Sequence, residues 1–340
     1  MIAAIGLVAV GLVALAIGAE CLVRGAASLA LRLGVSSLVV GLTVVAVGTS
    51  SPELFVSTGA AVHGDADIAI GNIVGSNIMN LAIILGLTAV IRPTRCNRQI
   101  QLREMPVMIG VSILLAAIAW WKPLVQGDQA IIGRADGLLL VSLATAYTFF
   151  AYRVTKMEVP SSKEIAELGK ESAAPAGART WGGNLFLIGI GLLLLYVGAE
   201  WLLAGAVTLA RMLGLSELTI GLTIVAIGTS MPEFATSLIA AIRHHDDISV
   251  GNIVGSNIMN VLLILGITCM IAPVHVSSEV LWRDIPVMFV VSLISWPMMV
   301  KGSNVSRFDG LLLLMCGFSY IAFLLATSST SSPTVLPAAP

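Results

Sequence analysis

The chain has 340 residues, of which 57% are hydrophobic and only 11% are charged, and its formal net charge at pH 7 is −1. With a mean hydropathy of +0.97, this composition excludes an ordinary soluble domain and indicates a protein that crosses a membrane several times. The 18 basic residues are dispersed between apolar segments, so binding to nucleic acid is not expected.

Apolar stretches that are long enough to cross a bilayer core of roughly 30 Å, about 20 residues each, occur repeatedly along the chain. In chain order they cover residues 2–23, 35–61, 68–91, 104–121, 131–152, 183–206, 215–242, 248–271, 284–300 and 308–327. The first stretch lacks a basic leader and ends in Gly18-Ala19-Glu20, which recurs as Gly198-Ala199-Glu200. We therefore expect it to be a retained spanning helix and not a signal peptide.

These stretches predict an all-α polytopic membrane protein with ten transmembrane helices in two five-helix repeats. The expected units are a first repeat over 1–153, a polar connector over 154–182, a second repeat over 183–327 and a disordered tail over 328–340. Because five is an odd number, the second repeat must start on the opposite side of the membrane, so the repeats are inverted.

The distribution of Lys and Arg predicts the orientation, since these residues favour cytoplasmic loops. An N-terminus on the outside places fourteen of the eighteen basic residues in cytoplasmic loops and four in outer loops. We therefore expect both termini outside and the connector over 154–182 in the cytoplasm.

Two segments of the first half return 180 positions later, which marks a duplicated unit. GLTVVAVGTSSPE at 41–53 returns as GLTIVAIGTSMPE at 221–233, and GNIVGSNIMN at 71–80 recurs unchanged at 251–260. Both copies carry a carboxylate, hydroxyls and amides inside apolar sequence, where lone polar groups are costly. The repeated segments are therefore where function is expected.

In the second predicted helix, Thr49, Ser50 and Glu53 stand at i, i+1 and i+4, so the hydroxyls and the carboxylate share one face. Pro52 removes a backbone hydrogen bond and bends the helix, which frees carbonyl groups that can act as ligands. The seventh helix repeats this pattern with Thr229, Ser230, Pro232 and Glu233. The third and eighth helices each add a polar ridge at i+4 steps, formed by Asn72, Ser76 and Asn80 and by Asn252, Ser256 and Asn260.

A single Ser, Thr or Asn in a membrane helix more often forms a hydrogen bond between helices than a ligand. The glutamates differ, because an ionised carboxylate at that depth costs at least ~2.5–3.5 kcal/mol and no basic residue lies in either motif helix. Two inverted copies would bring Glu53 and Glu233 together near the midplane of the bilayer. Oxygen ligands alone favour a hard cation such as Ca²⁺, which two carboxylates neutralise.

Two further groups of charged residues have simpler interpretations. Glu20 has Arg24 at i+4, which favours a structural ion pair. The cluster His244, His245, Asp246 and Asp247 has no matching ligand set in the first repeat, and we interpret it as a solvated loop.

The paired GLTxxAxGTSxPE and GNxxGSNIxN segments resemble the two α-repeats of the cation/Ca²⁺ exchanger superfamily, specifically the prokaryotic sodium/calcium exchangers. The resemblance covers nearly the whole chain and implies an integral protein of a prokaryotic plasma (inner) membrane. It implies that Glu53 and Glu233 are the central ion ligands. The further ligands that it implies are Thr49, Ser50, Thr229, Ser230, Ser76, Ser256, Asn80, Asn260 and the backbone carbonyls near Ala46 and Ala226. The family usually has an aspartate at the position of Asn260, so this chain has one potential negative charge fewer, and the stoichiometry and the driving ion stay open.

The expected function is secondary antiport of Na⁺ against Ca²⁺ by alternating access, with the first and sixth helices moving against the other eight. Neither catalysis nor a cofactor is expected, and the only predicted partners are the transported ions and the lipid bilayer; no protein partner is implied. A Ca²⁺/H⁺ antiporter on the same fold is the first alternative, with protons replacing sodium on the glutamates. A Ca²⁺ channel and an intramembrane protease are weaker alternatives, because an inverted repeat does not favour a channel and no HExxH motif is present.

Overall fold

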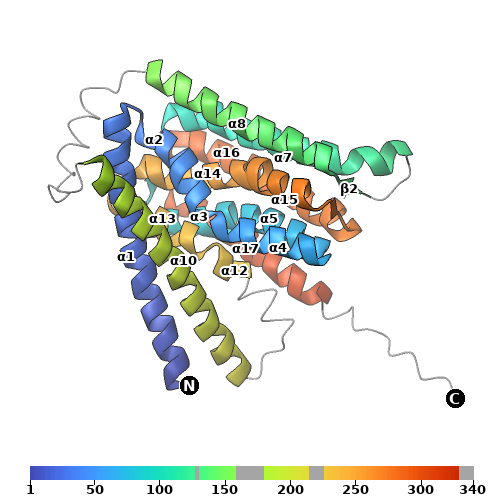
Figure 1. The fold of residues 1–340 in the computed structure, drawn as a ribbon, viewed down its shortest axis with the longest axis horizontal. Helices are drawn as coiled ribbons and strands as arrows, with labels where there is room; N and C mark the ends of the chain where they lie inside the picture. The colour runs from blue at the N-terminus through green and yellow to red at the C-terminus, as the bar shows by residue number, and fades with distance from the viewer. Residues whose placement is uncertain (127–129, 158–179, 214–225, 329–340) are drawn as a thin grey trace.

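The computed structural model describes residues 1–126, 130–157, 180–213 and 226–328, and helices dominate these parts (Figure 1). Most of the predicted connector (158–179) and all but the first residue of the predicted tail (329–340) lie outside the described residues. The first half contains α1 (Ile2–Leu33), α2 (Ser37–Val40), η1 (Gly41–Val45), α3 (Ala46–Thr49), α4 (Ser51–His63), α5 (Ala66–Met79), η2 (Asn80–Leu85), α6 (Gly86–Ile91), β1 (Thr94–Arg95), η3 (Ile100–Glu104), α7 (Met105–Gln126), β2 (Ile131–Ile132) and α8 (Arg134–Met157).

The second half repeats this order wherever it is described. It contains α10 (Trp181–Met212), α12 (Ala226–Thr229), α13 (Met231–Ile242), α14 (Asp246–Met259), η6 (Asn260–Leu265), α15 (Gly266–Ile271), β3 (Val274–His275), η7 (Val280–Asp284), α16 (Ile285–Val300), η8 (Lys301–Ser303), β4 (Asn304–Val305) and α17 (Arg307–Ser328). The short η elements are π-helical turns, except for the 3₁₀ turn η8.

The helices confirm the predicted polytopic architecture. Among the described residues, eight helices are long and apolar enough to cross a membrane, and the bent pair Ser37–Thr49 and Ser51–His63 makes a ninth span. The remaining span is the seventh in chain order, expected over 215–242. It is described from Ala226 onward as α12 and α13. The described residues thus form an all-α membrane protein in two repeats, with nine of the ten predicted spans and part of the remaining one.

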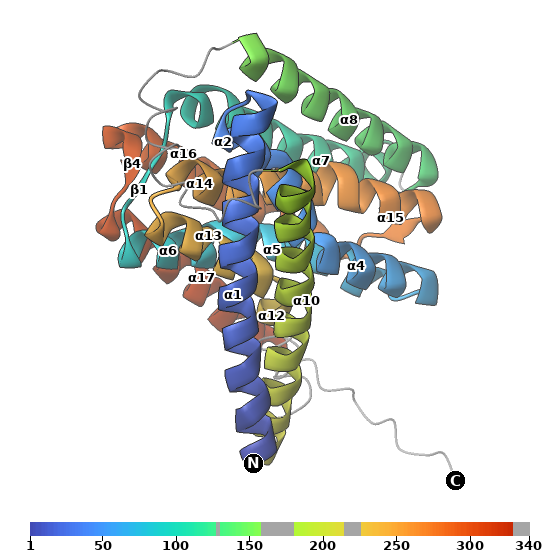
Figure 2. The ribbon, with the colours of Figure 1, turned by 60° about the vertical axis from the view of Figure 1, so that its left-hand side comes forward.

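Close packing of α1 against α10 shows that the repeats are inverted, because these equivalent helices run antiparallel (Figure 1). A Cβ atom added to Gly11 would lie 2.7 Å from the carbonyl of Gly198, and one added to Gly18 would lie 2.9 Å from that of Gly191. The residue number rises along one helix as it falls along the other, and small residues allow this close approach. The pair forms a long two-helix arm beside the remaining helices (Figure 2).

The first spanning helix is ten residues longer than predicted, since α1 continues from the expected end at residue 23 to Leu33. The predicted end is wrong because the charged residue Arg24, which follows the apolar stretch, does not end the helix. Arg24 instead pairs with Glu20 at 2.6 Å, as expected from their i,i+4 spacing. Beyond it, Ala26 and Ala30 are fully buried, so the helix remains packed.

The centre of the molecule is formed by α5 with η2 and by α14 with η6, which supply the largest hydrophobic cluster. Both π-helical turns begin at equivalent residues, Asn80 and Asn260. Two antiparallel strand pairs, β1 with β4 and β2 with β3, each join a loop of the first half to a loop of the second. Each pairing places its two loops at the same end of the molecule, as the alternating spans require.

Candidate functional site

Both predicted breaks in the motif helices are present. Ser50 and Ser230 leave helical geometry in the same way, with φ/ψ of −81°/8° and −89°/8°. Pro52 and Pro232 stand in the first turn of the helices that follow, where proline is tolerated because its missing N–H has no helical partner. The helix axis bends by 44° at Ser50. Glu53 and Glu233 thus lie just past a break, inside the first turn of α4 and α13.

The two glutamates are completely buried and are contacted by serines of the opposite repeat. Ser50 Oγ lies 2.9 Å from Glu233 Oε1, and Ser230 Oγ lies 3.4 Å from Glu53 Oε1. Ser76 also donates to Glu53 Oε1, at 3.3 Å. Because these contacts cross between the repeats, both carboxylates belong to one polar centre, as predicted.

The ridge residues hold the third and eighth helices against the broken helices. Asn72 Nδ2 donates to Ser57 Oγ at 3.0 Å and to the carbonyl of Glu53 at 3.4 Å. Asn252 makes the equivalent bonds to Ser237 Oγ, at 2.9 Å, and to the carbonyl of Glu233, at 3.4 Å. The ridge therefore fixes the backbone that carries each glutamate.

Hydroxyl groups complete the inner surface of the centre. Thr49 Oγ1 bonds to Asn252 Oδ1 at 3.0 Å, and Ser256 Oγ lies 3.0 Å from Ser50 Oγ. Ser230 Oγ lies 3.3 Å from Ser76 Oγ in the other half. Thr229 is also buried and lines the adjoining cavity.

The carbonyl of Ala46 faces this centre but already accepts hydrogen bonds. Its donors are Ser50 N at 3.0 Å, Thr49 Oγ1 at 3.3 Å and Ser256 Oγ at 3.5 Å. A cation bound by this oxygen would replace the two hydroxyl contacts. Ala226, the equivalent residue, begins α12.

A symmetric quartet of asparagines crosses the centre of the molecule. Asn80 Nδ2 donates to Asn257 Oδ1, and Asn260 Nδ2 donates to Asn77 Oδ1, both at 3.0 Å. Asn77 and Asn257 were not predicted as site residues. Their recurrence inside the unchanged GNIVGSNIMN segment is the signal that would have identified them.

Four buried oxygen atoms around this centre have no hydrogen-bond partner among the described residues. They are Glu53 Oε2, Glu233 Oε2, Asn80 Oδ1 and Asn260 Oδ1. Leaving one buried acceptor without a partner costs about 1–3 kcal/mol, and more for a charged group. Two carboxylate and two amide oxygens in this state are what a hard cation would satisfy.

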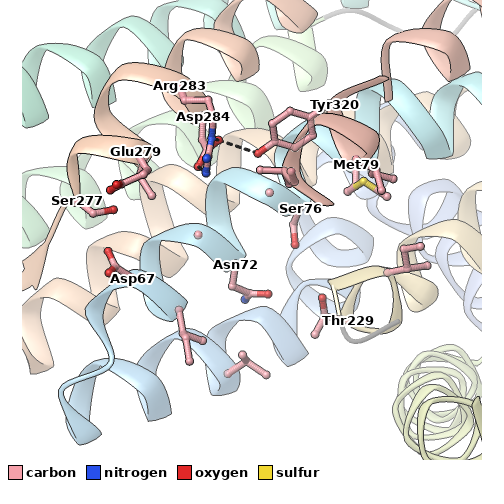
Figure 3. A pocket seen from close by; sticks show the side chains of 18 residues that line it. Asp67, Asn72, Ser76, Met79, Thr229, Ser277, Glu279, Arg283, Asp284 and Tyr320 are labelled. Atoms are coloured by element: carbon pink, nitrogen blue, oxygen red, sulfur yellow. Dashed lines mark hydrogen bonds and ion pairs between the residues drawn. The ribbon is translucent and has the colours of Figure 1, made fainter. Parts of the chain in front are cut away.

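A cavity of about 510 Å³ leads to the site on the side of the first repeat's Gly71 and Gly75. Asn72, Ser76 and Thr229 line its inner part, and Asp67, Ser277, Glu279, Arg283, Asp284 and Tyr320 line the rest (Figure 3). Gly71 and Gly75 of the first repeat also line this cavity. Their equivalents in the second repeat, Gly251 and Gly255, pack against Leu38 and Leu42 instead. Identical sequences thus have different surroundings in the two repeats.

The match to known proteins agrees with this geometry. The family model described as sodium/calcium exchanger protein matches residues 3–153 and 183–327. The chain belongs to the sodium/calcium exchanger family. Members of this family are transporters, and the chain is accordingly an integral membrane antiporter.

Individual relatives match over nearly the full chain. CaxA of Alkalimonas amylolytica is 38% identical, over 95% of this chain and 99% of the relative. The sodium/calcium exchanger MaX1 of Methanosarcina acetivorans is 30% identical, over 92% of this chain and 95% of its own. A structure of the sodium-calcium exchanger NCX_Mj, soaked with Na⁺ and Sr²⁺, superimposes with a TM-score of 0.78 at 30% identity, and the match covers 94% of this chain and 98% of that one.

Proposed function

We propose that this exchanger carries Ca²⁺ in one direction and Na⁺ in the other, and that both ions bind in turn at the centre formed by Glu53 and Glu233. The observation that supports this assignment is the cross-bonding of the two glutamates by serines of the opposite repeat, with one oxygen of each carboxylate left without a partner among the described residues.

The donor set favours hard cations. Ca²⁺ takes roughly 6–8 oxygen ligands, and the residues facing the centre supply carboxylate, amide, hydroxyl and backbone oxygens. The proposed ligands are Glu53, Glu233, Asn80, Asn260, Thr49, Ser50, Thr229, Ser230, Ser76, Ser256 and the carbonyls of Ala46 and Ala226. Two carboxylates neutralise one Ca²⁺, and competition for the same oxygens is what couples the two ions.

Alternating access follows from the asymmetry of the two repeats. One repeat is open to a cavity at Gly71 and Gly75, whereas the equivalent glycines of the other are packed. Exchanging these two environments would open the centre to the other side of the membrane. The α1–α10 pair, with its close glycine contacts, is the unit that we propose moves against the rest.

The orientation is also a proposal, and the strand pairs support it. The loops joined by β1 and β4 carry basic residues, three arginines in the first (Arg92, Arg95 and Arg98) and Lys301 and Arg307 in the second, and they lie at the same end of the molecule. Since basic loops favour the cytoplasm, this end is assigned to the cytoplasm and the end with β2 and β3 to the outside. The cavity at Ser277 and Glu279 would then open outward, and the connector would be cytoplasmic.

The proposal is tested by ⁴⁵Ca²⁺ flux in proteoliposomes with an imposed sodium gradient, compared with an imposed pH gradient of equal size. Sodium-driven flux is expected in the native protein, and its loss by a factor of at least ~100 is expected in Glu53→Gln, because the amide leaves the centre with one negative charge. Asp65→Asn, which makes the same chemical change in an exposed loop, should retain flux within about twofold.

Calcium flux that depends on the pH gradient and not on the sodium gradient would show that protons, and not sodium ions, are exchanged for Ca²⁺. Flux that needs neither gradient nor counter-ion would indicate a channel and contradict the antiport mechanism. Normal flux in Glu53→Gln would place the ion site elsewhere.

A further inference from the structure

We infer that Asn77 and Asn257 are positioning residues that force the side-chain oxygens of Asn80 and Asn260 to face the transported ion. All four side chains are at most 2% exposed. The inference rests on the proposed function, because it assumes that Asn80 and Asn260 are ion ligands. It adds two residues that act on the site without being ligands themselves.

The starting point is a reciprocal pair of bonds to the backbone. Asn77 Nδ2 donates to the carbonyl of Asn257, and Asn257 Nδ2 donates to the carbonyl of Asn77, both at 3.1 Å. A backbone carbonyl can only accept a hydrogen bond, so the NH₂ group of each side chain must be the end that faces it. The orientation of both amide groups is therefore fixed by the main chain, which cannot adapt by rotation.

Fixing the NH₂ groups also fixes the Oδ1 atoms, which lie at the other end of each amide. Asn77 Oδ1 faces Asn260, and Asn257 Oδ1 faces Asn80. An oxygen of an amide can only accept, so Asn260 and Asn80 must each present Nδ2 to it. Turning either amide around would place two acceptor oxygens about 3.0 Å apart.

The remaining oxygens, Asn80 Oδ1 and Asn260 Oδ1, are therefore held away from the quartet. Both are buried and have no hydrogen-bond partner among the described residues. Each also belongs to the first residue of a π-helical turn, a feature that often occurs at functional sites. Without Asn77, the amide of Asn260 could turn and present its NH₂ group, which repels a cation.

The expected effect of losing one positioning residue is a weaker affinity for Ca²⁺. Substitutions of residues that orient metal ligands typically cost 10–100-fold in metal affinity. Asn77→Ala and Asn257→Ala should therefore raise the KM for Ca²⁺ by about 10–100-fold in proteoliposome flux, with a smaller change in the maximal rate. Discrimination among Ca²⁺, Sr²⁺ and Ba²⁺ should also weaken, because the ligand geometry is less fixed.

A crossed set of double variants separates this role from simple packing. Aspartate has an oxygen at both ends of its planar group, so it can face the ion in either orientation. Asn260→Asp should restore a low KM to Asn77→Ala, because that substitution freed residue 260. Asn80→Asp should not restore it, because residue 80 is still held by Asn257. With Asn257→Ala the pattern should reverse, so that Asn80→Asp restores a low KM and Asn260→Asp does not.

Each double variant is compared with its single aspartate variant, which controls for the added negative charge. The matched pairs are expected to have a KM at least ~10-fold below the mismatched pairs, which have the same net charge. If alanine at 77 or 257 prevents folding, Asn77→Ser and Asn257→Ser take its place, since serine is polar but lacks the planar amide.

Equal KM values in matched and mismatched pairs, or a native KM in both alanine variants, would overturn the inference. These outcomes differ from a failure of the proposed function, which would appear as sodium-independent flux in the native protein or as normal flux in Glu53→Gln. The native KM and the Glu53→Gln variant are therefore measured in the same experiment.

Discussion

Replacing Gly255 with alanine should loosen the closed side of the site. A Cβ atom at Gly255 would lie 2.6 Å from Leu42 Cα and 2.7 Å from the carbonyl oxygen of Leu42. Both atoms belong to the backbone of η1, so they cannot move aside by a change of rotamer. The two helices must separate instead, and the closed arrangement becomes less stable.

The size of the effect follows from the cost of overpacking. Inserting a methyl group into a well-packed contact typically costs 1–3 kcal/mol. A free-energy change of this size shifts an equilibrium by about 5–150-fold. Gly75 is the equivalent residue of the first repeat and lines the cavity, with no heavy atom of the described residues within 4 Å of an added Cβ. Gly75→Ala should therefore leave the observed arrangement intact and disfavour the opposite one, in which the repeats exchange roles.

The rate at which a small hydrophilic reagent modifies a cysteine at position 236 measures this shift. Thr236 is fully buried, whereas its equivalent Val56 lines the cavity. The four native cysteines are first replaced by alanine. Gly255→Ala should accelerate modification of Thr236→Cys by about 5–150-fold, and Gly75→Ala should slow it. Val56→Cys serves as the control for the side that is already open.

The two glycine variants are expected to change the modification rate in opposite directions, and this allows a clear test. If both glycine variants change the modification rate in the same direction, the close contact at Gly255 does not hold one side closed. If neither changes it, then η1 and α14 separate without cost, and the packing argument is wrong. A general loss of stability would accelerate modification in both variants, so it cannot produce the opposite signs that are expected here.

Two further predictions concern groups outside the ion site. Tyr147→Phe should lower the free energy of unfolding by about 1.5–3 kcal/mol, because Tyr147 donates a hydrogen bond to the fully buried Glu104 at 2.7 Å. Tyr320→Phe should lower it less, since its partner Asp284 lines a cavity that water can enter. Thermal denaturation of both variants in detergent compares the two effects. Burial, together with the negative charges of Asp246 and Asp247, raises the pKa of the Cys96 thiol to about 12. Alkylation of Cys96 should therefore stay slow from pH 7 to 9 and become faster only as the pH approaches that value. Rapid alkylation at pH 8 in the folded protein would contradict a buried, neutral thiol.

The fold was largely predictable because lipid imposes a simple rule on sequence. Every spanning segment had to be a long apolar helix, and the odd number of helices per repeat required inversion. The bend at Ser50 followed from Pro52, and the approach of Glu53 and Glu233 followed from the repeat. In each case the sequence feature, whether an apolar stretch, a proline or a repeated segment, was compatible with only one structure.

Two features, one in the site and one in the fold, could not be predicted in this way. The positioning role of Asn77 depends on a backbone carbonyl 180 residues away, and a sequence does not show where a carbonyl points. The predicted end of α1 is wrong because Arg24 forms an ion pair with Glu20 on the same helix. This pairing allows the helix to continue past a charged residue. Both results depend on contacts that only the folded chain contains.

The difference between the two repeats raises the question of what selects the observed state, since the glycines that pack in the second repeat also occur in the first. The sequence differs at Arg92, whose equivalent is Ala272. Arg92 pairs with Asp246 at 2.6 Å and also donates to the carbonyl of Ala241, which joins the end of α6 to the start of α14. The loop before α14, interpreted from sequence as merely solvated, is therefore held by an ion pair that the first repeat cannot form. A partly exposed pair contributes at most about 1 kcal/mol, which is small against folding but enough to favour one of two nearly equivalent states about fivefold. Arg243, whose equivalent is His63, likewise pairs with Glu20 of α1 at 2.9 Å. In the proposed exchange of roles between the repeats, these two unmatched arginines would favour the state in which the second repeat is closed.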